Sequence, residues 1–149
     1  MRAIPRLVSV LATIPLLMAA TSEVAQYDPE LALSASRAAL GRSLQDLRLR
    51  DVDGQTFELG QLRGRPVVIS MIYTSCHHVC PTITRNVQNK VDIAREALGD
   101  EAFSVVTVGF DWKVDTPDRM NIYRRQFGID DPHWHFLSGD AATIDTLAA

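Results

Sequence analysis

Long hydrophobic runs, an excess of basic charge and internal repeats are all absent from this sequence of 149 residues. The net charge of -3 leaves no basic surface that would attract nucleic acid, so we expect no nucleic-acid partner. The Pro and Gly residues are scattered, which excludes a low-complexity linker. With this length and 46% hydrophobic residues, we expect one globular domain with a core of its own.

Cysteine is scarce: Cys76 and Cys80 are the only two, and three residues separate them. They follow residues 66–73, an apolar run that predicts a fully buried strand, and they precede a predicted helix. Two thiols at such a place indicate redox exchange or binding of a soft metal, and a structural disulfide or two buried thiols is the plain alternative. In an oxidising compartment a lone pair closes into a disulfide unless a metal or a reductant intervenes.

The first 22 residues differ in composition from the rest. Arg2 and Arg6 precede the apolar residues 7–18, and small residues follow at 19–22. This layout is typical of an export signal, and the apolar stretch is shorter than the about 20 residues that a membrane-spanning helix needs. We therefore expect residues 1–22 to be an export signal or N-terminal apolar segment, and the protein to be exported to the periplasm or the outer face of the inner membrane.

Two local patterns precede the cysteines. Residues 29–40, between Asp28 and Gly41, predict a helix within an N-terminal helical extension that covers residues 23–40. Further on, Asp53-Gly54 separates two segments of alternating apolar and polar residues and predicts a tight β-hairpin.

Strands and helices alternate in residues 41–149, which predicts a single α/β domain. The predicted strands are residues 66–73, 103–110 and 134–137, and the predicted helices begin at Pro81, Thr116 and Asp140. This order predicts a central sheet with helices on both faces. Sites in such sheets lie outside the carboxyl ends of the strands, so we expect Cys76 and Cys80 to meet Asp111 and Asp115 at one edge.

The hairpin, the segment 62–66, the apolar strand and the paired cysteines together resemble thioredoxin-like proteins. Four short motifs make the resemblance more specific and are similar to those of the Sco (SenC-type) family: Tyr73-Thr74-Ser75-Cys76, Cys80-Pro81, Phe110-Asp111 and Asp115-Thr116-Pro117. The resemblance to this family extends from about Ala38 to the last residue. Members of that family are exported or membrane-tethered copper proteins that serve assembly of the dinuclear copper centre of cytochrome c oxidase.

The resemblance implies a thioredoxin-like fold and a copper chaperone that delivers copper to, or prepares, that centre. Its implied partner is the copper-receiving subunit of cytochrome c oxidase, with another periplasmic copper chaperone or a thiol reductant as a further candidate. It also implies that Cys76 and Cys80 bind copper through sulfur. Thiolates select Cu(I), so we expect Cu(I) rather than Cu(II).

Four side chains near the cysteines are candidates for accessory roles. His77 and His78 could supply a substitute ligand or favour the thiolates, or they could be exposed loop histidines. Asp111 and Asp115 could supply a weak oxygen ligand or orient the loop, or they could serve only a turn and the start of the next helix.

The sequence departs from the family pattern downstream. Family members complete the copper site with a histidine in a segment that has no counterpart before Ala149, so we expect a domain that is incomplete at its C-terminus and lacks the closing hairpin and final helix. His133 and His135 flank Trp134 in a predicted strand and match no ligand position. We expect them to be ordinary strand or loop histidines.

Two other functions stay open. One is a thiol-disulfide oxidoreductase that acts on the cysteines of the oxidase copper site, with Cys76 and Cys80 catalytic and Cys76 as the attacking thiolate. The other is a redox or copper sensor. Thioredoxin-type reductases separate their cysteines by two residues, and the wider spacing here favours metal binding over reductase activity.

Overall fold

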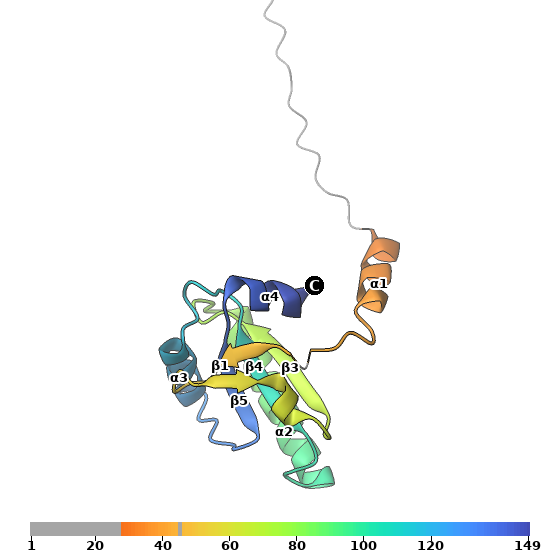
Figure 1. Ribbon diagram of the computed structural model, residues 1–149. Coiled ribbons are helices and arrows are strands. Elements are labelled where there is room, and N and C mark those ends of the chain that lie inside the picture. The colour runs from red at the N-terminus through yellow and green to blue at the C-terminus, as the bar shows by residue number, and fades with distance from the viewer. Residues whose placement is uncertain (1–27, 45) are drawn as a thin grey trace, which may run out of the picture. The chain divides into compact units, whose positions relative to one another are not determined.

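The computed structural model describes residues 28–44 and 46–149 (Figure 1). The predicted export segment, residues 1–22, lies outside the described residues. Helix α1 (Pro29–Ala38) belongs to one unit of the chain, and residues 39–149 form a second unit. Within the described ranges, no helix combines the length and the apolar character that crossing a bilayer would require.

The ends of α1 follow from its sequence. Asp28 Oδ1 accepts hydrogen bonds from the backbone N–H groups of Glu30 and Leu31, at 2.9 and 3.2 Å, and so caps the helix. Pro29 occupies the first helical position, where its missing N–H costs no hydrogen bond. The predicted helix is confirmed, although it ends at Ala38 rather than at residue 40.

A five-stranded sheet with the order β2-β1-β5-β4-β3 runs through residues 39–149. Its strands are β1 (Arg48–Arg50), β2 (Thr56–Glu58), β3 (Val67–Ile72), β4 (Ser104–Gly109) and β5 (Trp134–Ser138). β1 and β2 form the predicted antiparallel hairpin, and Gly54 supplies the positive φ of 76° at its turn. β3, β4 and β5 are parallel and end in register, because Ile72 pairs with Gly109 and Gly109 pairs with Ser138.

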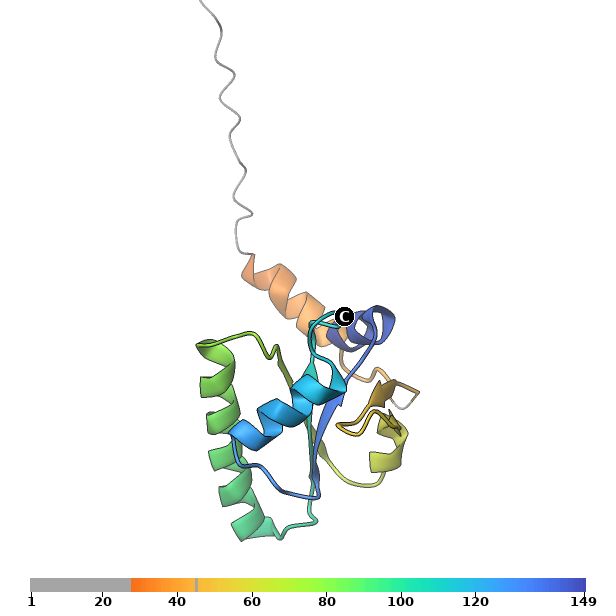
Figure 2. The ribbon, with the colours of Figure 1, turned by 90° about the vertical axis from the view of Figure 1, so that its left-hand side faces the viewer.

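Helices cover both faces of the sheet, as predicted (Figure 2). α2 (Val79–Leu98) and α3 (Pro117–Gln126) lie on one face, and α4 (Ala141–Ala148) and the short helix η1 (Leu59–Leu62) lie on the other. Each face has its own apolar core. The first core includes Ile72, Val91, Val105, Met120, Tyr123 and Phe136, and the second includes Leu49, Leu59, Val106, Val108, Leu137 and Ile144.

Two expectations about the segment around the cysteines are wrong in detail. β3 is an edge strand and not a fully buried one: Val68 is 43% exposed, and all six residues of the neighbouring β4 are buried instead. α2 begins at Val79 and not at Pro81, so Cys80 lies in the first turn of the helix. Pro81 fits there because the first N–H groups of a helix have no partner within the helix.

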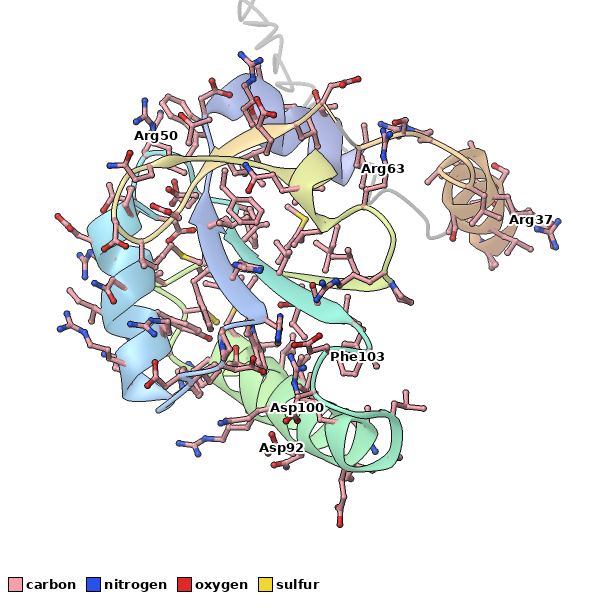
Figure 3. The ribbon with its side chains drawn as sticks, turned by 60° about the horizontal axis from the view of Figure 1, so that its bottom comes forward. Arg37, Arg50, Arg63, Asp92, Asp100 and Phe103 are labelled. Atoms are coloured by element: carbon pink, nitrogen blue, oxygen red, sulfur yellow. The ribbon has the colours of Figure 1, made fainter. Side chains whose placement is uncertain are left out.

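A buried arginine ties the far end of α2 to the connections that precede β4 and β5. Arg95 forms an ion pair with Asp131 at 2.7 Å, and its guanidinium lies 4.9 Å from the ring centre of Phe103. It also donates to the backbone carbonyl of Asp100. Figure 3 shows Asp100 and Phe103 together at the connection between α2 and β4. These contacts hold this end of α2 against the connections before β4 and β5, and the opposite end of the helix carries Cys80.

Candidate functional site

Cys76 and Cys80 lie in the connection from the carboxyl end of β3 into α2. A turn brings Cys76 into place, because its backbone N–H donates to the carbonyl of Tyr73 at 3.1 Å. The backbone N–H of Cys80 then donates to Cys76 Sγ at 3.3 Å. Both residues are free thiols; Cys76 is half-buried and Cys80 is only 5% exposed. One sulfur is therefore accessible, and the second lies buried beside it.

The two thiols differ in acidity. Hydrogen bonds from the backbone N–H groups of Cys80 and His78 lower the pKa of Cys76 from 9.0 to about 6. These N–H groups belong to the start of α2, where the helix dipole also favours a negative charge. Burial raises the pKa of Cys80, and so does the neighbouring Cys76 sulfur. At neutral pH Cys76 is therefore a thiolate, while Cys80 keeps its proton.

Tyr73 contacts the accessible thiol, a contact that the sequence did not indicate. Its hydrogen bond with Cys76 raises the pKa of the Tyr73 hydroxyl. The ring lies edge-on to Phe110, with the ring centres 5.2 Å apart. The only sequence feature that could have indicated this contact is the position of Tyr73 directly before the cysteine loop. That position is equally consistent with a tyrosine that only packs against its neighbours.

Asp115 joins the two loops that leave β3 and β4. Its Oδ1 accepts hydrogen bonds from the backbone N–H of Thr74, at 2.8 Å, and from the Thr74 hydroxyl, at 2.7 Å. Its Oδ2 accepts from the backbone N–H of Asp111 at 2.9 Å. The predicted meeting of these loops at the carboxyl ends of the strands is confirmed. Because both carboxylate oxygens already accept hydrogen bonds, the contacts favour an orienting role over an oxygen ligand.

The other accessory candidates, Asp111, His77 and His78, make fewer side-chain hydrogen bonds than Asp115. Asp111 accepts a hydrogen bond from the backbone N–H of Lys113 at 3.3 Å. His77 and His78 are exposed, and the His78 side chain forms no capping bond to α2. No group of three or more His, Cys, Asp or Glu side chains able to hold a metal ion occurs in residues 28–44 and 46–149. Their accessory roles stay predictions.

His133 and His135 lie away from the cysteine loop. The ring of His135 is 4.8 Å from that of Phe57, and His133 Nδ1 is 3.5 Å from an Arg65 nitrogen. Both flank Trp134 at the start of β5, whereas the cysteines follow the opposite, carboxyl ends of the parallel strands. Burial lowers the pKa of His135, which fits a strand histidine packed in the domain.

Comparison with known proteins identifies the family. The SCO1/SenC family model matches residues 37–149. The chain belongs to the SCO1/SenC family. An SCO2-like protein of Rickettsia typhi is 33% identical over 79 residues, which are 53% of this chain and 38% of that protein.

Solved Sco structures share the fold. ScoI of Bradyrhizobium japonicum, solved with copper bound, is 33% identical with a TM-score of 0.56, over 67% of this chain and 60% of that one. A SCO1/SenC lipoprotein of Bacillus anthracis is 25% identical with a TM-score of 0.64, over 73% of this chain and 64% of that one. The predicted thioredoxin-like α/β fold is confirmed by these neighbours. The Sco chain described here thus spans less than two thirds of the length of each of these three relatives.

Proposed function

We propose that this Sco protein binds Cu(I) between Cys76 and Cys80 and delivers it to, or prepares, the dinuclear copper site of cytochrome c oxidase. The observation that carries the proposal is the pair of free thiols held together at the start of α2, with the Cys80 N–H bonded to Cys76 Sγ. Sulfur donors select Cu(I) over harder ions. The copper-bound structure of the related ScoI supports the same choice of metal.

Cys76 and Cys80 differ in acidity and in burial, and this difference suits the binding and release of a monovalent ion. Cys76 is already a thiolate at neutral pH, so uptake of Cu(I) by the pair releases one proton, from Cys80. Cys80 is buried, and an incoming ligand of the acceptor therefore reaches the metal from the side of Cys76. The acceptor that the family resemblance supplies is the copper-receiving subunit of the oxidase, met on the periplasmic side by an exported protein.

A competition titration tests the proposal. Reduced protein is mixed with Cu(I) and a chromogenic Cu(I) chelator, and we expect about one Cu(I) per chain to be retained by the two thiolates. Cys76→Ser and Cys80→Ser should each abolish retention, because either change leaves one sulfur. His77→Ala and His78→Ala, in the same loop, test the accessory role: unchanged retention means that the two sulfurs alone hold the ion, and weakened retention means that an imidazole assists them. If the wild-type protein leaves all copper with the chelator, the proposal is wrong.

A second function is favoured by the same asymmetry. An accessible thiolate next to a buried thiol of raised pKa is an arrangement that suits disulfide exchange. The Cys76 thiolate would attack a disulfide of the acceptor and form a mixed disulfide, releasing one acceptor thiolate. Cys80, after losing its proton, would attack Cys76 Sγ and release the second. The protein is oxidised by two electrons and the acceptor disulfide is reduced to two thiols.

Trapping separates the two functions. Cys80→Ser should accumulate a mixed disulfide with a disulfide-bonded peptide if exchange occurs, because the resolving thiol is gone. Copper retention together with no trapped adduct supports the chaperone function. A trapped adduct without copper retention supports the oxidoreductase.

A further inference from the structure

Asp115 is a carboxylate buried to 1% exposure whose hydrogen bonds end on the two loops that flank the cysteines. We propose that Asp115 is the positioning residue of the cysteine loop, and that Thr74 transmits its position to Cys76. This inference rests on the proposed function in so far as Cys76 and Cys80 are the metal-binding pair. It gives a role to Thr74, which belongs to the Tyr73–Cys76 motif but was assigned no function there, and to Gly109, which lies outside the motif.

The first step is the contact between Asp115 and Thr74. Thr74 lies inside the turn that the hydrogen bond from Cys76 N–H to the Tyr73 carbonyl closes. Both donors of Thr74, its backbone N–H and its hydroxyl, point to Asp115 Oδ1 at 2.8 and 2.7 Å. Two bonds to one oxygen fix both the backbone and the side chain of this residue. The turn is therefore held two residues before the accessible sulfur.

The second step is the support of Asp115 itself. Its backbone N–H donates to the carbonyl of Asp111 at 2.7 Å, while its Oδ2 accepts from the Asp111 N–H at 2.9 Å. Gly109, the last residue of β4, leaves the space that Asp115 occupies. A Cβ at residue 109 would collide with the Asp115 side chain and would lie 2.8 Å from Met120 Sδ. The absence of a side chain at 109 is thus a condition for the position of the carboxylate.

The third step connects the turn to the sulfur. Cys76 Sγ accepts the N–H of Cys80 at 3.3 Å, and Cys80 is fixed because it is part of α2. Cys76 meets this N–H only while the turn before it is held in place. Asp115 makes no hydrogen bond to either cysteine, so its hydrogen-bonded hold on the cysteine loop runs through Thr74. The separation of the two sulfurs is therefore set from a residue that precedes α3.

A matched set of isosteric variants tests this inference. Thr74→Val removes one hydroxyl bond to Asp115, and Thr74→Ser restores it. Thr107→Val is the control: the Thr107 hydroxyl is also buried and bonds to Ser70 Oγ and Trp134 Nε1, both at 2.9 Å, but within the sheet and away from the loop. Gly109→Ala adds a methyl group that collides with the Asp115 side chain, and so displaces the same carboxylate without changing Thr74.

Three quantities are measured on each variant: unfolding in urea, Cu(I) affinity by chelator competition, and the dithiol–disulfide equilibrium with dithiothreitol. In the last, the protein disulfide takes two electrons and two protons from the reductant, which becomes its own cyclic disulfide. Thr74→Val should weaken Cu(I) binding and shift the equilibrium towards the protein disulfide, each by about fivefold, the effect of one typical hydrogen bond. The shift is towards disulfide because the reduced Cys76 loses its held place against the Cys80 N–H.

The controls decide the outcome. We expect Thr74→Ser and Thr107→Val to stay within about twofold of the wild type in both constants, although Thr107→Val also loses stability, and Gly109→Ala to follow Thr74→Val. If Thr74→Val and Gly109→Ala lower stability while both constants stay at the wild-type values, Asp115 is only structural and the inference is wrong. If the wild type binds no Cu(I), the proposed function fails, and the disulfide equilibrium still tests the positioning role.

Discussion

The two ends of β3 lie in different surroundings although one uncharged segment forms both. At the carboxyl end Ile72 is fully buried, and the loop beyond it is held by Asp115. Towards the amino end Val68 is 43% exposed and lines an apolar groove of about 560 Å³ along α2. Side chains of α2 such as Ile83 and Leu98 line the same groove and are also exposed, at 40% and 69%.

The difference shows which contacts make the site. Apolar residues form both ends of β3, so apolar character alone does not explain why one end carries a defined pair of thiols. The carboxyl end is distinguished by directed bonds, from Thr74 and Asp111 to Asp115 and from Cys80 to Cys76. Hydrophobic burial has no direction, whereas hydrogen bonds fix positions and angles.

The largest expected contrast is within β3 itself. Ile72→Ala should lower the free energy of unfolding by about 4 kcal/mol, because it leaves a cavity in a fully buried site. Val68→Ala, on the same strand, should cost less than about 1 kcal/mol, because the side chain is already partly in water. Urea unfolding of both variants measures the difference. Equal losses would mean that the two ends of β3 do not differ in solution.

The next contrast concerns two carboxylates of one loop. Asp115→Ala should lower the free energy of unfolding by about 3 kcal/mol, because three donors in a buried place lose their acceptor. Asp111→Ala removes the acceptor of a single exposed N–H and should cost about 0.5 kcal/mol. The two values come from the same urea experiment. A loss for Asp111→Ala as large as that for Asp115→Ala would contradict the assignment of the support to Asp115.

The acidity of the thiols sharpens the contrast further. The pKa of Cys76 is lower in the folded protein, about 6, than its ordinary value of 9.0. The stabilisation that its thiolate contributes is therefore complete above about pH 9 and is lost as the pH falls through about 6. Alkylation of the reduced protein, followed by mass spectrometry, should show half-maximal reactivity of Cys76 near pH 6, and Cys80 should react only at high pH. A single midpoint near 9 for both thiols would disprove the asymmetry.

The smallest expected effect is at the open side of β3. Val68→Lys should change the free energy of unfolding by no more than about 0.5 kcal/mol, since a surface change away from special features is usually mild. It should also reduce binding of a hydrophobic dye, because the charge interrupts the apolar groove. Cu(I) retention should stay at the wild-type value. A loss of copper binding in this variant would show that the two ends of β3 are coupled.

Most of the fold followed from local patterns. Alternation around Asp53-Gly54 predicted the hairpin, and Thr116 and Asp140 were correctly expected to cap helices, since both accept the predicted backbone N–H bonds. The position of β3 at the edge was not predictable in this way. An uncharged run has the same sequence signal at the edge and at the centre of a parallel sheet, and strand order depends on crossovers and not on composition.

The candidate site, like the fold, was predictable in its main residues but not in its supporting contacts. The cysteine pair and the meeting with the loop of Asp115 came from motif spacing and from the rule that sites form at the carboxyl ends of parallel strands. Thr74, Tyr73 and Gly109 were not assigned a role from the sequence, because their roles depend on which residues they contact in the folded protein. Thr74 donates to Asp115, Tyr73 contacts Cys76, and Gly109 leaves space for the Asp115 side chain.

The sequence by itself determined the thiol pair, the α/β order and membership of the Sco pattern, because these depend on residue types and their spacing along the chain. Only the tertiary structure decided that Cys76 is the accessible thiolate and Cys80 the buried thiol. The physical reason is that acidity and access depend on N–H groups and burial supplied by the start of α2. The same holds for Asp115, whose hydrogen-bond partner Thr74 is 41 positions away along the chain.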